Sequence, residues 1–118
     1  MTTHKKIQLL PDGSKLPPAA ERARRLMELA DAMDARHAFR PGQIVRWKPG
    51  LRNRTWPAYG EVCIVREVLA VPVFEAGGEI SATRSYFREP LTLVLGMLDD
   101  DSDLVEFYYD ARRFEPTG

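Results

Sequence analysis

The chain has little of what membrane proteins, secreted proteins and metal sites require. No apolar run approaches the roughly 20 residues that cross a bilayer, and the segment 1–11 has charge followed by too few apolar residues for a secretory signal. Its one cysteine, Cys63, cannot form an internal disulfide. Two histidines and one cysteine make a poor zinc set, because a closed site needs about four such ligands at short spacings. We therefore expect a cytoplasmic protein that does not associate with membranes.

Catalytic signatures are also missing from the sequence. Gly77-Gly78 is followed by Glu79 with no lysine-serine pair downstream, so the pattern of a phosphate-binding loop is absent. Cys63 lies in the apolar run 62–65, without the positive surroundings that activate a thiol, and we interpret it as a small buried hydrophobe. The sequence predicts a protein that is not an enzyme, with no cofactor, no bound metal and no small-molecule substrate.

Charge is unevenly spread along a chain whose formal net charge is +0. The segment 40–59 contains no carboxylate, and the segment 99–110 contains no basic residue. The first segment holds five basic side chains and three large rings: Arg40, Arg46, Lys48, Arg52, Arg54, Trp47, Trp56 and Tyr59. The second holds six acids: Asp99, Asp100, Asp101, Asp103, Glu106 and Asp110. Such polarity selects binding partners.

The first half of the chain predicts one helix. We expect a flexible lead-in over 1–16 and a helix over 17–38, where apolar residues recur every three or four positions: Ala23, Leu26, Ala30 and Met33. The helix must end before Pro41, because the residue before a proline avoids helical geometry. We expect this helix to pack on the domain that follows.

From Gln43 onward the apolar residues alternate, which is typical of strands. Val45 and Trp47 share one face of a predicted first strand, and Arg46 and Lys48 share the other. Further strands are predicted over 61–69, 71–75, 91–98 and 104–109, the last two forming a β-hairpin across the acidic turn 99–103. One helix followed by short strands predicts a single domain that is mainly β, with a small antiparallel barrel over 39–118.

Residues 39–115 resemble the SH3-like small barrels, which include the KOW and Tudor modules. The resemblance rests on Phe39-Arg-Pro-Gly-Gln-Ile-Val-Arg-Trp47, a first strand of the "pGD.V" type with Gln43 in place of the usual acid. A long loop, the run Tyr59-Gly60-Glu-Val-Cys-Ile-Val65 and a closing hairpin follow. The resemblance implies an SH3-like antiparallel barrel that binds nucleic acid, ribosomal or polymerase surfaces, or peptides, and that is not a catalyst.

The loop after the first predicted strand is the candidate binding site. Guanidinium groups of Arg52 and Arg54 suit phosphates, and the ring of Trp56 or Tyr59 offers a plane on which a base can stack. Alternation assigns Trp47 to the core, whereas Trp56 fits either the core or the surface. The predicted nucleic-acid-binding residues are Arg46, Lys48, Arg52, Arg54, Trp56 and Tyr59. Against this, solvated arginines are the plainer interpretation, and a net charge of +0 lacks the basic excess typical of nucleic-acid-binding domains.

The acidic segment supports a second interpretation. Asp99, Asp101 and Asp103 alternate like the first ligands of a calcium loop, but Leu104 stands at the sixth position, where that loop needs glycine. We therefore predict a solvated hairpin turn, whose acids either repel nucleic acid from that end or pair with a basic surface on a partner or on a second copy. The alternative function is a protein–protein interaction module or a homodimer that uses the acidic hairpin and the Trp56 loop.

The end of the chain should close the barrel. We expect Arg112 and Arg113 to neutralise Asp110 or Glu106, and Phe114 to fill the end of the core.

Overall fold

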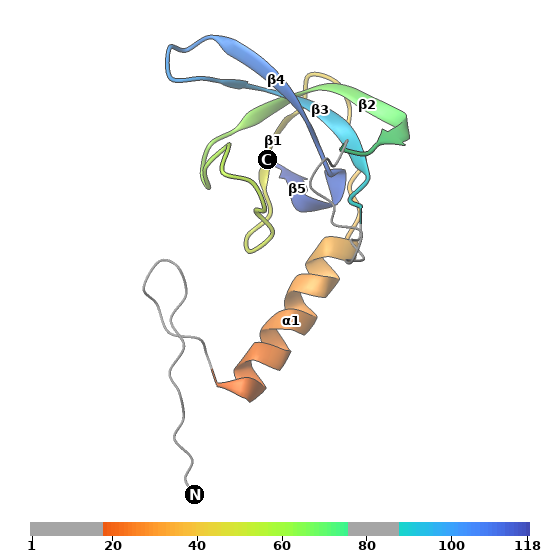
Figure 1. The fold of residues 1–118 in the computed structure, drawn as a ribbon, viewed down its shortest axis with the longest axis vertical. Coiled ribbons are helices and arrows are strands. Elements are labelled where there is room, and N and C mark those ends of the chain that lie inside the picture. Colours follow the sequence, from red (N-terminus) through yellow and green to blue (C-terminus); the bar gives the residue numbers. More distant parts are fainter. Residues whose placement is uncertain (1–17, 76–87) are drawn as a thin grey trace, which may run out of the picture. The chain divides into compact units, whose positions relative to one another are not determined.

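A computed structural model describes residues 18–75 and 88–118 of the protein (Figure 1). The chain divides into two compact units, 1–32 and 33–118, which are described separately below. The predicted lead-in over 1–16 and the pair Gly77-Gly78 lie outside the described residues.

The helix α1 spans Ala19–Asp34 and is shorter than the predicted 17–38. It begins after Pro18, whose carbonyl accepts a hydrogen bond from Arg22 N at 2.9 Å. None of the residues of α1 is buried, and its packing on the sheet stays a prediction. No helix in the described ranges combines the length and apolar character needed to cross a bilayer.

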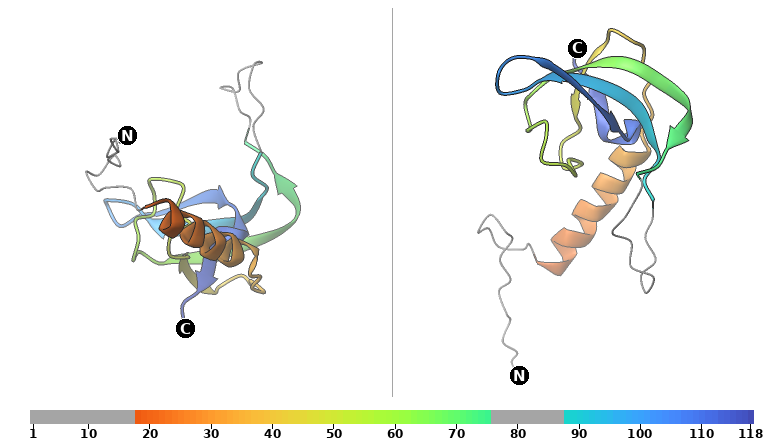
Figure 2. Two further views of the ribbon diagram at one scale, coloured as in Figure 1. Left: turned by 90° about the horizontal axis from the view of Figure 1, so that it is seen from below. Right: turned by 45° about the horizontal axis from the view of Figure 1, so that its top comes forward.

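The second unit contains one five-stranded antiparallel sheet with the strand order β4-β3-β2-β1-β5 (Figures 1 and 2). The strands are β1 Ile44–Trp47, β2 Cys63–Val73, β3 Leu91–Leu98, β4 Leu104–Tyr109 and β5 Phe114–Pro116. A 3₁₀ helix, η1, spans Ala111–Arg113 between β4 and β5. The mainly β class and the hairpin of β3 and β4 are therefore confirmed.

Two features of the sheet differ from the prediction. The strand β2 runs through Pro72, where the sequence predicts separate strands over 61–69 and 71–75. Its register against β3 shifts between Val68 and Val73, and such an irregularity accommodates a residue that cannot donate a backbone hydrogen bond. The sequence did not predict β5, a strand of 3 residues that pairs with β1.

The core lies on one face of the sheet and is centred on Trp47. The indole stacks on Phe114 with ring centroids 4.3 Å apart, and the ring of Tyr109 meets both at an angle. Aliphatic side chains from β1, β2 and β3 complete the cluster: Val45, Val65, Leu93 and Leu95. The predictions that Trp47 and Phe114 belong to the core are confirmed.

Cys63 also lies in this core, as predicted. Burial, with a smaller contribution from Glu61, raises the pKa of its thiol to about 12. A thiol that stays protonated at neutral pH is a poor nucleophile, which agrees with a packing role.

Candidate nucleic-acid interface

The candidate loop connects β1 to β2 and is anchored to the core at two points. Leu51 and Pro57 are buried, and Trp47 Nε1 donates a hydrogen bond of 2.6 Å to the carbonyl of Pro57. The hydroxyl of Tyr109 donates to the carbonyl of Trp56 at 2.7 Å. The shape of the loop is therefore set by contacts with the core.

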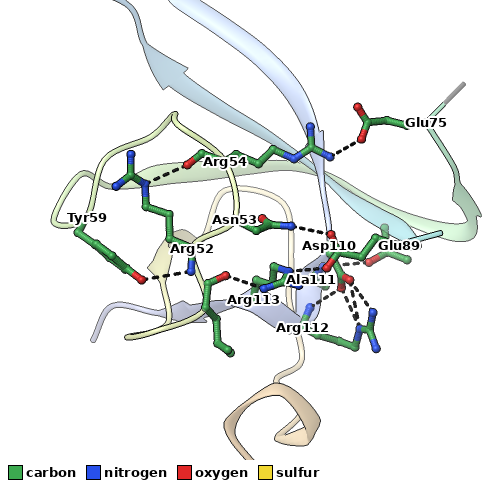
Figure 3. Close-up of polar contacts among 12 residues, drawn as sticks. Arg52, Asn53, Arg54, Tyr59, Glu75, Glu89, Asp110, Ala111, Arg112 and Arg113 are labelled. Carbon is green, nitrogen blue, oxygen red and sulfur yellow. Dashed lines mark hydrogen bonds and ion pairs between the residues drawn. The ribbon is translucent and has the colours of Figure 1, made fainter. Parts of the chain in front are cut away.

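A carboxylate that no sequence pattern singles out braces the start of this loop. Glu89 accepts a hydrogen bond of 2.7 Å from Asn53 Nδ2 and a second one from Arg113 Nε (Figure 3). Arg113 also donates to the carbonyl of Leu51 at 2.9 Å. Glu89 comes just before β3 and Arg113 lies in η1, so the loop is tied to two distant parts of the chain.

Arg52 and Tyr59 come together on the loop (Figure 3). The guanidinium of Arg52 lies 5.5 Å from the centroid of the Tyr59 ring, and it donates to the carbonyls of Arg54 and Thr55 at 2.9 and 2.6 Å. Tyr59 is 49% exposed, and its hydroxyl accepts from the backbone N–H of Arg52. An open pocket of about 340 Å³ is lined by Arg52, Asn53, Arg54, Thr55 and Tyr59.

Two other predicted site residues form ion pairs with the protein's own carboxylates. Arg54 pairs with Glu75 at 2.8 Å, and its guanidinium lies 5.9 Å from the ring of Tyr109. Arg46 Nε lies 3.0 Å from the carboxylate of Glu115 on β5. Each pair includes at least one side chain that is half exposed or more, and exposed ion pairs are worth only about 0–1 kcal/mol. A phosphate group can therefore compete for both arginines.

Lys48 does not contribute to an accessible surface. Strand alternation predicts that Lys48 lies on the outer face with Arg46, but β1 ends at Trp47 and the alternation stops there. Lys48 is 3% exposed, and its Nζ donates a hydrogen bond of 2.8 Å to the carbonyl of Ala35. Burial lowers the pKa of this ammonium group, although Glu115, Asp110 and Asp34 act in the opposite direction.

Trp56 is half-buried and packs against the edge of the core. Its ring centroid lies 5.7 Å from that of Phe107 on β4. The sequence left open whether Trp56 belongs to the core or to the surface. Each interpretation is partly correct, because the ring covers the core and part of it stays exposed.

Of the two basic residues near the C-terminal end, one forms an ion pair with an expected carboxylate and the other does not. Arg112 forms the predicted pair with Asp110, at 2.7 Å, and hydrogen bonds to that carboxylate raise the pKa of the guanidinium. Arg113 pairs with Glu89, whereas Glu106 is paired with Arg66 on β2 at 2.6 Å.

The acidic turn forms as predicted between β3 and β4. Asp99 Oδ1 accepts hydrogen bonds from the backbone N–H groups of Asp101 and Asp103, at 2.8 and 2.9 Å. Ligand atoms of these three carboxylates lie within 4.8 Å of one another. Asp110, the last acid of the segment 99–110, lies apart from them, buried at the other end of β4 beside Arg112.

Comparison of the chain with protein-family models, with curated proteins and with solved structures gives no match. The function of the protein must therefore be inferred from the geometry of the candidate loop.

Proposed function

We propose that the protein is a small, non-enzymatic binding module that binds single-stranded nucleic acid through the loop between β1 and β2. The observation that carries the proposal is the open pocket where the guanidinium of Arg52 lies beside the exposed ring of Tyr59. Such a pair offers a positive charge for a phosphate and a ring face for a base. A base must be unstacked to use that face, which favours single strands.

The proposed fold is an SH3-like small barrel. The strand β1 pairs with both β2 and β5, and β2 is 11 residues long with two register shifts against β3. Bulges of this kind bend a strand, so that one long strand can belong to both halves of a curved sheet. Phe114 on β5 and Leu95 on β3 share one core, which supports the same arrangement.

The proposed contact residues are a subset of those predicted from the sequence. Arg52, Arg54 and Tyr59 line the pocket, and Trp56 adds a partly exposed ring from the same loop. Arg46 supplies a further exposed charge from β1. Lys48 is not a contact residue in this proposal. Its buried Nζ donates a hydrogen bond to the carbonyl of Ala35 and so fixes the segment after α1.

The test is the salt dependence of oligonucleotide binding. Binding is measured by the fluorescence anisotropy of a labelled single-stranded 12-mer. We expect the affinity of the wild-type protein to fall steeply with salt, and Arg52→Ala to weaken binding and reduce the slope of log K against log salt by about 1. Replacing Tyr59 by leucine should cost about 1–3 kcal/mol of binding free energy. Arg25→Ala on α1, which removes one charge elsewhere, is the matched control.

Because Arg52 also bonds to the carbonyls of the loop, a second variant separates charge from loop structure. Arg52→Lys keeps the charge but loses the planar fork, so it should retain the wild-type salt slope. If Arg52→Ala and Arg25→Ala show the same affinity and slope, the proposed interface is wrong.

A second candidate function is a protein-interaction module or homodimer that uses the acidic hairpin and the Trp56 loop. The observation in its favour is that Leu98 and Leu104 stand exposed at the two ends of the acidic turn. No oligonucleotide binding at low salt, together with a mass that rises with protein concentration, would favour this function.

A further inference from the structure

The strand β4 lies at the margin of the sheet and pairs only with β3 (Figure 2). Within the described ranges, no segment other than β3 forms a backbone hydrogen bond with Leu104–Tyr109. An edge strand of this kind presents a row of N–H and C=O groups to which another strand can pair.

The register shows which backbone groups face outward. Asp99 N donates to Asp103 O at 2.9 Å, so these residues form a hydrogen-bonded pair at the start of the hairpin. Bonded and non-bonded pairs alternate along an antiparallel ladder, and the register of β3 and β4 continues without a shift. The residues that bond to β3 are therefore Val105, Phe107 and Tyr109. The backbone groups that face away are those of Leu104, Glu106 and Tyr108.

This edge lacks the devices that protect edge strands. The strand β4 has no proline, no lysine and no bulge, and its one charged residue, Glu106, is paired with Arg66. Leu104 is 56% exposed and Tyr108 is 48% exposed, on the same face of the strand. A partner strand would therefore gain both backbone hydrogen bonds and apolar contacts.

We propose that two copies of this chain pair through β4 in antiparallel orientation and so continue the sheet across a two-fold axis. A two-fold pairing uses the β4 edge of each copy and leaves neither β4 available to a further strand. The inference gives the self-association alternative a defined interface, and it does not rest on nucleic-acid binding.

The distribution of charge favours the antiparallel orientation. The acidic turn, 99–103, precedes β4, whereas the charges of Arg112 and Arg113, which follow it, are balanced by Asp110 and Glu89. Antiparallel pairing sets the acidic turn of one copy beside this charge-balanced end of the other, at both ends of the interface. Parallel pairing would set the two acidic turns side by side, where like charges repel.

The experiment measures the protein's mass and its backbone amide exchange by NMR at concentrations that span a hundredfold. We expect the mass to rise from 13.4 kDa to twice that value. The amides of Leu104, Glu106 and Tyr108 should become protected in parallel with the mass, whereas those of Val105, Phe107 and Tyr109 are protected throughout. A constant mass, or a doubled mass with these three outward amides still exchanging fast, overturns the proposal.

A matched pair of variants tests the interface itself. Leu104→Lys combined with Tyr108→Lys should weaken dimerisation at least tenfold, because the new charges would meet across the axis. Val62→Lys combined with Val71→Lys makes the same chemical change at exposed positions outside β4 and should leave dimerisation unchanged. Equal dimerisation in both variants contradicts the proposal.

A measurement on the unaltered protein covers the case in which the lysine variant fails to fold. In a mixture of isotope-labelled and unlabelled protein, contacts between the two copies should join the start of one β4 to the end of the other. Contacts that join like ends, or contacts only at other segments, would show that the proposed pairing is wrong.

Discussion

Trp47 connects the core of the sheet to the candidate loop. Its ring stacks on Phe114 and meets Tyr109 edge-on, while its single donor, Nε1, bonds to the carbonyl of Pro57. An indole has no other hydrogen-bonding group, so this buried bond satisfies it completely. The position of Pro57, and with it the path of the loop toward Tyr59, therefore depends on how the core packs.

The burial of Lys48 can be tested by measuring how the free energy of unfolding depends on pH. Its pKa is lowered from 10.5 in the folded protein, so above the folded pKa the unfolded chain still binds a proton that the folded protein has released. The free energy of unfolding must then rise with pH between the folded pKa and about 10.5, with a slope of at most about 1.4 kcal/mol per pH unit. The cost of burying the charge is fully present below this window.

Lys48→Met removes the titrating group and isolates this effect. We expect wild-type stability, measured relative to the variant by urea denaturation from pH 7 to 10.5, to increase toward the alkaline end. Contributions from Cys63 and Tyr109 are present in both proteins and cancel in the difference. Two curves that run parallel across this range would show that Lys48 is not desolvated in the fold.

At the scale of elements, the loop between β1 and β2 is held by polar contacts as well as by the core. Glu89 accepts from both Asn53 and Arg113, and the side chains of Glu89 and Arg113 are mostly buried. Removing an acceptor shared by two donors leaves both without their partner. The loop should therefore lose order when this carboxylate is deleted, even though Glu89 itself does not line the pocket.

Glu89→Ala is the corresponding variant. We expect the free energy of unfolding to fall by about 1–3 kcal/mol and the amides of residues 51–55 to exchange faster. Glu67→Ala, which removes an exposed carboxylate from β2, should change stability by less than about 0.5 kcal/mol. Equal stability of the two variants would mean that Glu89 does not brace the loop.

The observed helix and strands show which elements can be predicted from local sequence patterns. The period of two predicted β1, because it reflects which side chains face a core. The period of three to four predicted α1 although none of its residues is buried, and the apolar run 91–98 with the acidic turn predicted the hairpin of β3 and β4. The extent of α1 was overestimated by four residues at its C-terminal end, since no proline or glycine precedes Pro41 to mark the stop. The strand β5 was not predicted, because a strand of 3 residues is too short to show an alternating pattern. It is a strand only because it pairs with β1.

At the scale of the whole molecule, opposite charges concentrate in different parts of a neutral chain. Asp100 and Asp101 are exposed in the turn between β3 and β4, whereas Arg52 and Arg54 lie on the candidate loop. Charges that do not touch a ligand still change the potential that the ligand meets, over about 10 Å at 0.1 M salt.

We expect Asp100→Asn combined with Asp101→Asn to raise the affinity for a single-stranded oligonucleotide about two- to fivefold at low ionic strength, because long-range repulsion is reduced. The gain should disappear above about 0.5 M salt, where the Debye length is short. Asp99 is left in place because it caps the turn. An affinity that stays unchanged at low salt in the same anisotropy assay would contradict this electrostatic effect.

The amino-acid sequence alone determined that the protein is mainly β with one helix, that Trp47 and Phe114 are core residues, and that a basic, ring-bearing segment follows the first strand. These properties are local, because the spacing of apolar residues decides which side of an element is buried. Only the tertiary structure decided which basic groups reach solvent. The partner of Arg54 lies 21 positions away, that of Arg46 lies 69 positions away, and Lys48 is buried where β1 ends. Ion pairs and burial of this kind depend on how distant segments meet in three dimensions, which spacing along the chain does not encode.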